Sequence, residues 1–230
     1  MEESEKILER FNTHRFKREQ PHTKEALLGA IEYFVGLGKP IEFVMYWGKG
    51  DRDSIAGPEK EAIGLLLEMK NEIQSAYKKG AHITFIFTDT HAQLNGYALQ
   101  GISSYYESLA DCAGQSGITL EKMSSITPFY EKLLEEQVAT VELSSDFAAI
   151  LAAASEKHYK NSHSEFGAKM YYLQNQLERI AIEDKYPKSI FLTYNNSDWN
   201  PILPNKLPIF YMHSLRKGIG IKPWFAEKNL

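Results

Sequence analysis

Apolar residues recur every three or four positions in some stretches of the chain and form short continuous runs in others. The first pattern is typical of amphipathic helices and the second of buried strands. The distribution of apolar residues predicts helices over Ser4–Phe11, Lys24–Leu37, Pro58 to the Lys78-Lys79-Gly80 stop, Ser103–Ala113, Pro128–Gln137, Ser145–Lys157 and Glu165–Asp184. It predicts strands over Ile41–Trp47, His82–Phe87, Ile118–Met123, Ser189–Tyr194, Ile209–His213 and Gly218–Lys222.

The clearest unit runs from the first of these strands to the second. Pro58 suits the first position of a helix, and Glu59 follows in the first turn, where the helix dipole favours a carboxylate. Gly80, after two lysines, is a typical helix end. A strand, helix and strand joined by connections of this length predict a right-handed parallel crossover.

Helices and strands continue to alternate along the rest of the chain, which indicates an α/β protein. We expect a Rossmann-like, mostly parallel sheet flanked by helices, with an antiparallel portion near the C-terminus where the strands crowd together. No repeat or linker marks a boundary, so residues 1–230 are predicted to form a single domain, with the helices of residues 1–39 packing on it. The long helix should bury one apolar side, which comprises Phe166, Met170, Leu173, Leu177 and Ile180.

The composition narrows the class of protein further. With 43% hydrophobic and 24% charged residues, the chain is able to fill a core. Its net charge of −4, with cations interspersed among anions, offers no attraction to nucleic acid or to an anionic membrane. Its apolar runs are short of the roughly 20 residues that a membrane span needs. Cys112 is the one cysteine, which fits a reducing compartment, and the acidic N-terminus is typical of a helix and not of a leader. We expect a cytoplasmic protein with no nucleic-acid or membrane partner.

Two polar loops directly follow the first two strands, at the edge where α/β sheets bind ligands. The first carries Lys49, Asp51, Arg52 and Asp53 beside two glycines. Lys49 and Arg52 are suited to hold a phosphate or a carboxylate. In the alternative, the loop is a solvated turn in which these cations and the neighbouring aspartates neutralise each other. The loop has neither a P-loop nor a dinucleotide-binding glycine pattern, so no cofactor is expected.

The second loop carries Asp89, His91, Gln93 and Asn95 at alternating positions. In an extended backbone these side chains would share one side, where Asp89 would orient His91 as a general base. In the alternative, Asp89 caps the next helix and His91 has a structural role. His213, at the end of a predicted strand, is a further candidate. No metal is expected, because the spacing specifies no third ligand.

Read in order, these features resemble the isonitrile (isocyanide) synthase family, which includes L-tyrosine and L-tryptophan isonitrile synthases and dityrosine-pathway relatives. Members have a loop Lys after a strand, a Pro-acidic pair and a Glu at a helix start, a Tyr-x-x-Gly-Ala run and a strand ending in Asp. The matching positions are Lys49, Pro58-Glu59, Glu61, Tyr77–Ala81 and Asp89. Towards the C-terminus the family has Ile-Arg-Leu-Ser-Ile-His, a downstream Lys and Pro-Trp-His. The corresponding positions are Ile190–Asn195, Lys206 and Pro223–Phe225.

The resemblance implies a Rossmann-like biosynthetic enzyme that acts on the α-amine of an amino acid and on a phosphosugar, ribulose 5-phosphate. It implies that Lys49 and Arg52 meet a carboxylate or phosphate and that Asp89 assists proton transfer. Gln93, Asn95, Lys206 and His213 are the further substrate-binding candidates.

The sequence also departs from the family, which points to a divergent member with another amine or another transfer reaction. Phe191 replaces an Arg, Asn195 and Phe225 each replace a His, and Thr90 stands where Gly is usual. Two other hypotheses stay open, since function resides in the site and not in the scaffold. One is acid-base or metal-assisted chemistry by Asp89, His91 and His213, and the other is a non-catalytic sensor or effector with the same fold.

Overall fold

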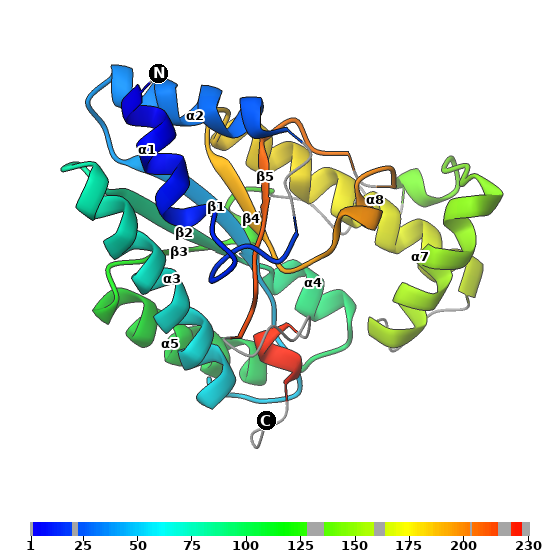
Figure 1. The fold of residues 1–230 in the computed structure, drawn as a ribbon. Coiled ribbons are helices and arrows are strands. Elements are labelled where there is room, and N and C mark those ends of the chain that lie inside the picture. Colours follow the sequence, from blue (N-terminus) through cyan, green and yellow to red (C-terminus); the bar gives the residue numbers. More distant parts are fainter. Residues whose placement is uncertain are drawn as a thin grey trace.

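The computed structural model describes residues 2–19, 23–127, 136–158, 164–202, 204–215 and 222–226 (Figure 1). The α-helices are α1 (Glu2–Phe11), α2 (Lys24–Gly36), α3 (Gly57–Ala76), α4 (Asp89–Leu94), α5 (Leu99–Gln115), α7 (Ser145–His158) and α8 (Ser164–Lys185). The strands are β1 (Ile41–Trp47), β2 (Ala81–Phe87), β3 (Thr119–Lys122), β4 (Ile190–Thr193) and β5 (Ile209–Tyr211). Short 3-10 turns are η1 (Met123–Ser125), η2 (Ser197–Trp199) and η3 (Pro223–Phe225). None of the helices in these ranges has the length and apolar content to cross a membrane.

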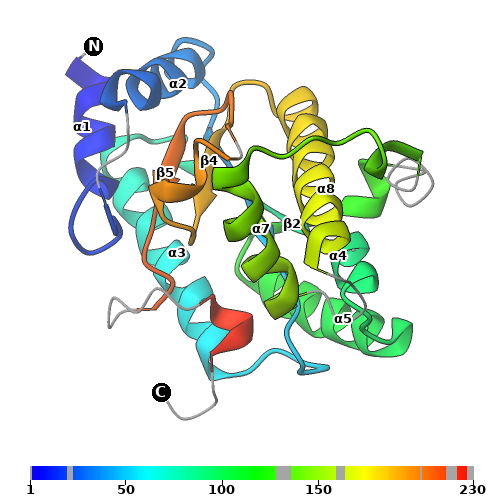
Figure 2. The ribbon, with the colours of Figure 1, turned by 90° about the vertical axis from the view of Figure 1, so that its right-hand side faces the viewer.

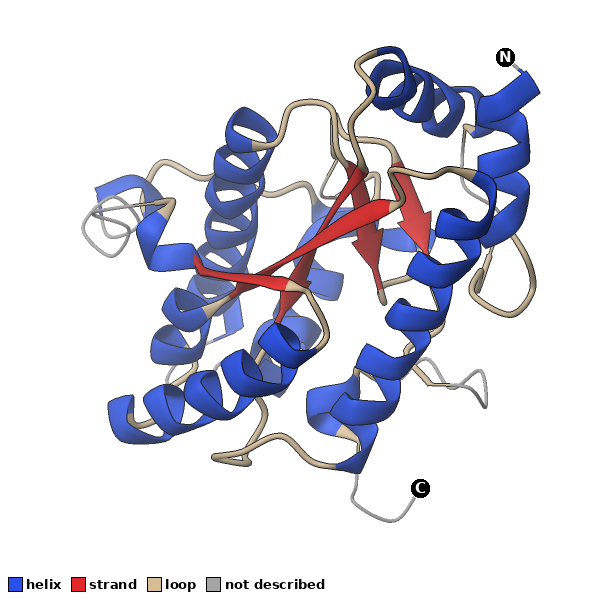
Figure 3. Ribbon diagram, turned by 90° about the vertical axis from the view of Figure 1, so that its left-hand side faces the viewer, coloured by secondary structure: helices blue, strands red, loops and turns tan. Residues whose placement is uncertain are grey.

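The five strands form one parallel sheet in the order β3-β2-β1-β4-β5 (Figure 3). β1 pairs with β2 along its whole length, from Ile41 opposite Ala81 to Trp47 opposite Phe87. On its other side, Phe43–Met45 of β1 pair with Ile190–Leu192 of β4. The chain thus extends the sheet first to one side of β1 and later to the other, as in doubly wound folds.

Helices cover both faces of the sheet (Figure 1). Phe43 and Met45 of β1 point to the face where α1, α2, α3 and α5 form the larger core. Val44, between them, points to the opposite face and packs near Ile182 of α8. Because successive side chains of a strand alternate, a continuously apolar strand such as β1 supplies both cores. Figure 2 shows α7 lying alongside α8.

The α/β fold class predicted from the sequence is confirmed, with one correction. β4 and β5 pair in parallel, so the antiparallel portion expected near the C-terminus is wrong for these strands. Among the described residues, the antiparallel contact in this region is an isolated bridge from Lys17 to Met212. Most of the expected strand over Gly218–Lys222 and most of the expected helix over Pro128–Gln137 lie outside the described residues.

The apolar side predicted for α8 is also wrong in part. Met170 and Leu173 are buried, but Phe166 and Ile180 are exposed, at 48% and 45%. Polar residues are buried along the helix in their place, namely Gln174, Glu178, Arg179 and Glu183. A helix that buries so many polar groups faces something other than an apolar core.

The N-terminal helices pack against the larger core. The Phe11 ring meets the rings of Phe43 and Phe210 edge-on, with centroids 5.5 and 5.2 Å away. We predict that Phe11→Leu lowers the free energy of unfolding by about 1–2 kcal/mol, because leucine fills this space incompletely. Urea unfolding followed by circular dichroism should show one shifted transition. An unshifted main transition would contradict the single-domain proposal.

Candidate functional site

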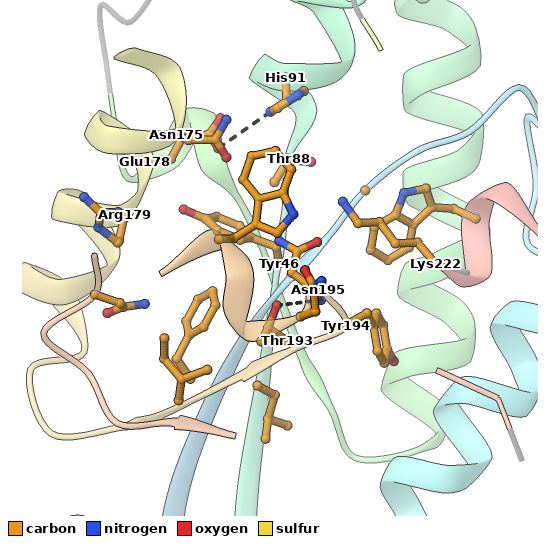
Figure 4. Close-up of a pocket in the computed structure, with 18 of the residues that line it drawn as sticks. Tyr46, Thr88, His91, Asn175, Glu178, Arg179, Thr193, Tyr194, Asn195 and Lys222 are labelled. Carbon is orange, nitrogen blue, oxygen red and sulfur yellow. Dashed lines mark hydrogen bonds and ion pairs between the residues drawn. The ribbon is translucent and has the colours of Figure 1, made fainter. Parts of the chain in front are cut away.

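A cavity of about 140 Å³ opens at the carboxyl ends of β1, β2 and β4 (Figure 4). This is roughly ten times the space that one water molecule needs, so the cavity is able to take a small organic molecule. It lies where the order of strands reverses, between β1 and β4, which is the usual ligand position in doubly wound sheets. Its wall includes Tyr46, Gly48, Lys49, Thr88, His91, Asn95, Tyr171, Asn175, Glu178, Arg179, Phe191, Thr193, Tyr194, Asn195, Trp199, Lys222, Trp224 and Phe225.

The two polar loops singled out in the sequence meet at this cavity. β1 and β2 are adjacent and parallel, so the segments that follow them leave the sheet side by side. Lys49 comes from the first segment, and His91 and Asn95 come from the second. Both loops therefore contribute side chains to the same cavity, although Asp89 and Arg52 are not among its lining residues.

Lys49 is buried and already has partners within its own loop. Its side chain is 1% exposed, and its ammonium lies 3.1 Å from Asp53 Oδ1. It also donates to the carbonyl oxygens of Gly50 and Arg52, at 3.2 and 2.7 Å. The rings of Tyr97 and Tyr105 lie 5.0 and 5.5 Å away, which adds cation–π stabilisation. The ammonium thus holds the loop in shape, and a contact with substrate stays a prediction.

Arg52 fastens the C-terminal segment to this loop and is not among the residues that line the cavity. Its guanidinium donates to the carbonyl oxygens of Ala226, at 2.5 Å, and Pro223, at 2.9 Å. It also forms a 2.6 Å ion pair with Glu59, which is fully buried at the start of α3. We call this set of contacts the Arg52 clamp. It holds Trp224 against one side of the cavity.

The loop and the C-terminal segment approach so closely that only glycine fits between them. A Cβ at Gly48 would lie 2.7 Å from the indole of Trp224, and a Cβ at Gly50 would overlap the Trp224 carbonyl oxygen. The glycines noted in the sequence therefore allow the backbone of the loop to contact this wall.

The second loop is helical, so the expected extended backbone is wrong there. Residues 89–94 form α4, and Asp89 is its first residue. The N-cap is Thr88, and Asp89 does not cap the helix with its side chain. The Asp89 carboxylate instead accepts hydrogen bonds from the backbone N–H and the hydroxyl of Ser124, at 3.0 and 2.5 Å. It joins the end of β2 to η1.

We therefore predict that Asp89→Ala acts mainly on stability. The substitution leaves the Ser124 N–H without its acceptor and removes two hydrogen bonds to a charge, so unfolding should be easier by about 2 kcal/mol. Thermal and urea unfolding measure this change. Ser124→Ala, which removes one of the two bonds, should cost roughly half as much. Full stability of Asp89→Ala would contradict the assignment.

The carboxylate beside His91 belongs to Glu178 of α8 and not to Asp89. Glu178 Oε2 lies 3.9 Å from His91 Nδ1, and Figure 4 shows the two side chains directed toward each other. Glu178 Oε1 accepts from the Thr90 hydroxyl at 3.1 Å and from the Gln174 amide at 3.3 Å. The His91 ring also meets the Tyr171 ring edge-on at 5.6 Å. The cavity thus holds an imidazole, with a fixed buried carboxylate next to it.

The remaining predicted residues fall into two groups. Asn95 is buried on the cavity wall, and its side-chain oxygen accepts no hydrogen bond in the described structure. Gln93 is exposed on α4, and Lys206, with a side chain 86% exposed, lies 3.8 Å from Glu183. His213 follows β5 and donates its backbone N–H to Phe16. Neither Gln93, Lys206 nor His213 is among the lining residues, so their substrate-binding roles stay predictions.

Several residues of the wall were not foreseen from the sequence. Tyr46, Glu178 and Arg179 meet at the side of the cavity formed by β1 and α8 (Figure 4). Burial raises the pKa of Tyr46 well above its usual value, and the charge of Glu178 raises it further. Burial lowers the pKa of the Arg179 guanidinium, which faces Glu183 at 3.5 Å. The sequence feature that could have indicated this polar wall is the i, i+4 spacing of Gln174 and Glu178, which places both on one face of α8. The prediction from the sequence concerned only the apolar side of this helix.

The parallel order 3-2-1-4-5, the helices on both faces and the cavity at the strand reversal define a Rossmann-like α/β protein. Among solved structures, the chain is similar to the PvcA protein of Pseudomonas aeruginosa, with a TM-score of 0.70 and 17% identity over 96% of this chain and 87% of that one. A tyrosyl-tRNA synthetase from Archaeoglobus fulgidus, solved with L-tyrosine, gives a TM-score of 0.53 and 13% identity over 92% and 64% of the chains. No family model and no curated protein sequence matches. These similarities establish the fold.

Proposed function

We propose that the chain is a biosynthetic enzyme related to the isonitrile synthases, which brings together an amino-acid-type amine and a phosphosugar such as ribulose 5-phosphate. The observation that carries the proposal is the cavity at the strand reversal, with His91 and Glu178 on its wall. The similarity of the fold to PvcA, and the order of the sequence motifs, which resembles that of the isonitrile synthases, support it. The second neighbour, solved with L-tyrosine, is a further protein of similar fold that takes an amino acid.

The departures from the family pattern favour a divergent reaction or substrate. Phe191, Asn195 and Phe225, which replace an Arg and two His, all line the cavity. Thr90, at the position where Gly is usual, donates its hydroxyl to Glu178. Because all four changes fall on the cavity or on its buried carboxylate, they alter what the cavity binds and leave the scaffold intact.

His91 is the proposed general base. An imidazole titrates near neutral pH, and a carboxylate next to one ring nitrogen favours the tautomer that leaves the other nitrogen free to take a proton. Glu178 stands in that position relative to His91 Nδ1. In this arrangement, Lys49 and Asp89 support the loops that shape the cavity.

The test is to incubate the purified protein with ribulose 5-phosphate and each of a panel of amino acids and to search for new masses. A product that requires both substrates and carries the nitrogen of a ¹⁵N-labelled amino acid is expected. Absence of product across the panel from folded protein would remove the proposal. Binding without turnover would instead favour the non-catalytic sensor or effector.

A further inference from the structure

Glu178 is a buried carboxylate at the cavity. Its side chain is 1% exposed. Glu178 lies on α8 and faces Thr90 and His91 of α4 across the cavity wall. Oε1 is held by Thr90 and Gln174, whereas Oε2 accepts no hydrogen bond from the described residues and has the His91 ring 3.9 Å away. One oxygen is therefore fixed by the protein, and the other is left for another donor.

Lys49 and Arg179 line the cavity, and each faces a carboxylate other than Glu178. Lys49 is paired with Asp53, and Arg179 lies next to Glu183. Within the described part of the chain, His91 is the one basic side chain within 4 Å of Glu178. A buried carboxylate needs a counter-charge, because removal from water costs several kcal/mol per ion.

Further buried polar atoms of the lining residues have no hydrogen-bond partner in the described structure, and they include Nε and Nη1 of Arg179 and the Tyr194 hydroxyl. The Tyr46 hydroxyl and the Asn95 side-chain oxygen are buried, line the cavity and make no hydrogen bond in the described structure. Both are able to accept a hydrogen bond, as Oε2 of Glu178 is. The wall thus offers unpaired acceptors beside a buried carboxylate, whereas Nε of Arg179 faces Glu183 at 3.5 Å.

Aromatic rings complete this part of the wall. Tyr171 and Trp199 both line the cavity, and their ring centroids are 6.3 Å apart. Burial, and then the charge of Glu178, raises the pKa of Tyr171 to about 12, so this hydroxyl stays neutral at physiological pH. A carboxylate next to neutral aromatic rings is the combination that binds organic cations, through an ion pair and cation–π contacts.

We propose that Glu178 binds the positive charge of the ligand, a protonated amine held in the cavity beside His91 and Tyr171. The inference rests on the proposed function in that it places the amine substrate at a particular residue. It assigns to Glu178 a binding role, and it does not require that the phosphosugar or any reaction be as proposed.

The experiment uses the full chain and three probes with the same phenyl group. 2-Phenylethylamine is a cation, 2-phenylethanol is its neutral counterpart and 3-phenylpropionate is an anion. Isothermal titration calorimetry is carried out with the unchanged protein, with Glu178→Gln and with Glu183→Gln. Glutamine keeps an acceptor for Thr90, and Glu183 is a matched control because it is a buried glutamate of the same helix that does not line the cavity.

We expect 2-phenylethylamine to bind at least tenfold more tightly than the alcohol or the acid. Glu178→Gln should weaken amine binding by about tenfold to a hundredfold, the usual range for a hydrogen bond to a charged group. It should leave alcohol binding unchanged, and Glu183→Gln should bind the amine as the unchanged protein does. Equal binding of amine and alcohol, or a folded Glu178→Gln that binds the amine normally, would overturn the proposal.

The outcome is separable from that of the product assay. Amine binding that depends on Glu178, without product from any amino acid and ribulose 5-phosphate, would remove the proposed reaction and keep this site. Product formation with normal amine affinity in Glu178→Gln would keep the reaction and remove the site. If Glu178→Gln does not fold, Thr90→Val, which removes the hydroxyl that orients the carboxylate, should weaken amine binding several-fold, and normal binding by it would count against the proposal.

Discussion

Replacement of Arg52 by methionine is expected to lower the free energy of unfolding by about 3–5 kcal/mol, the usual cost of removing one partner of a buried ion pair. Glu59 is fully buried, and Arg52 is its ion-pair partner at 2.6 Å. Methionine keeps much of the apolar stem but leaves the carboxylate without a counter-charge. It also removes the donors that hold the carbonyl oxygens of Pro223 and Ala226. Urea unfolding at neutral pH measures the loss.

The double variant Arg52→Met with Glu59→Gln is the control for this interpretation. Glutamine keeps an acceptor for the backbone N–H of Ala56, which Glu59 Oε2 accepts at 3.0 Å, but carries no charge. The double variant should regain at least half of the lost stability, because the uncompensated charge is gone. A single variant that loses less than about 1 kcal/mol would show that the Arg52 clamp contributes no more than an exposed ion pair does.

Replacement of His91 by glutamine is expected to lower kcat by about a hundredfold to ten-thousandfold, the usual contribution of a general base. Glutamine has similar polarity but does not take up a proton near neutral pH. Because binding of the amine is assigned to Glu178, KM should change little. Steady-state rates with the amino acid and ribulose 5-phosphate pair that gives product provide the measurement.

Gln115→Ala is the control, since Gln115 is exposed at the end of α5 and is not among the residues that line the cavity. It should have the kcat of the unchanged protein. A His91→Gln protein that turns over normally would exclude His91 as the base. A variant that raises KM and leaves kcat unchanged would give His91 a binding role instead.

The alternating polar residues after β2 illustrate how far the sequence leads. Asp89, His91, Gln93 and Asn95 would share one side of an extended chain, but α4 is a helix, in which residues four apart share a face. His91 and Asn95 therefore line the cavity, whereas Asp89 and Gln93 do not. The location of the site at the carboxyl ends of the strands was predictable from the sequence. Which pair of residues lines the cavity, His91 and Asn95 or Asp89 and Gln93, depends on whether the backbone after β2 is helical or extended, and the sequence did not indicate this.

The partners of the site residues are distant in sequence, and no local pattern indicates them. Arg52 bonds to Pro223 and Ala226, and Thr90 bonds to Glu178, 88 positions further along the chain. From the sequence, the polar side of α8 would be expected to face solvent. Periodicity alone does not show whether polar residues face bulk water or an internal cavity. The β1 and β2 strands were predictable because their apolar runs are bounded by glycine, proline and polar loops.

The cavity at the carboxyl ends of β1, β2 and β4 is expected to hold the ligands of this protein. A crystal structure of the protein soaked with ribulose 5-phosphate and with 2-phenylethylamine should show density for the amine next to Glu178 and Tyr171, and density for the phosphosugar in the same cavity. If both ligands bind elsewhere on the protein and only solvent fills this cavity, the ligands do not bind where we propose.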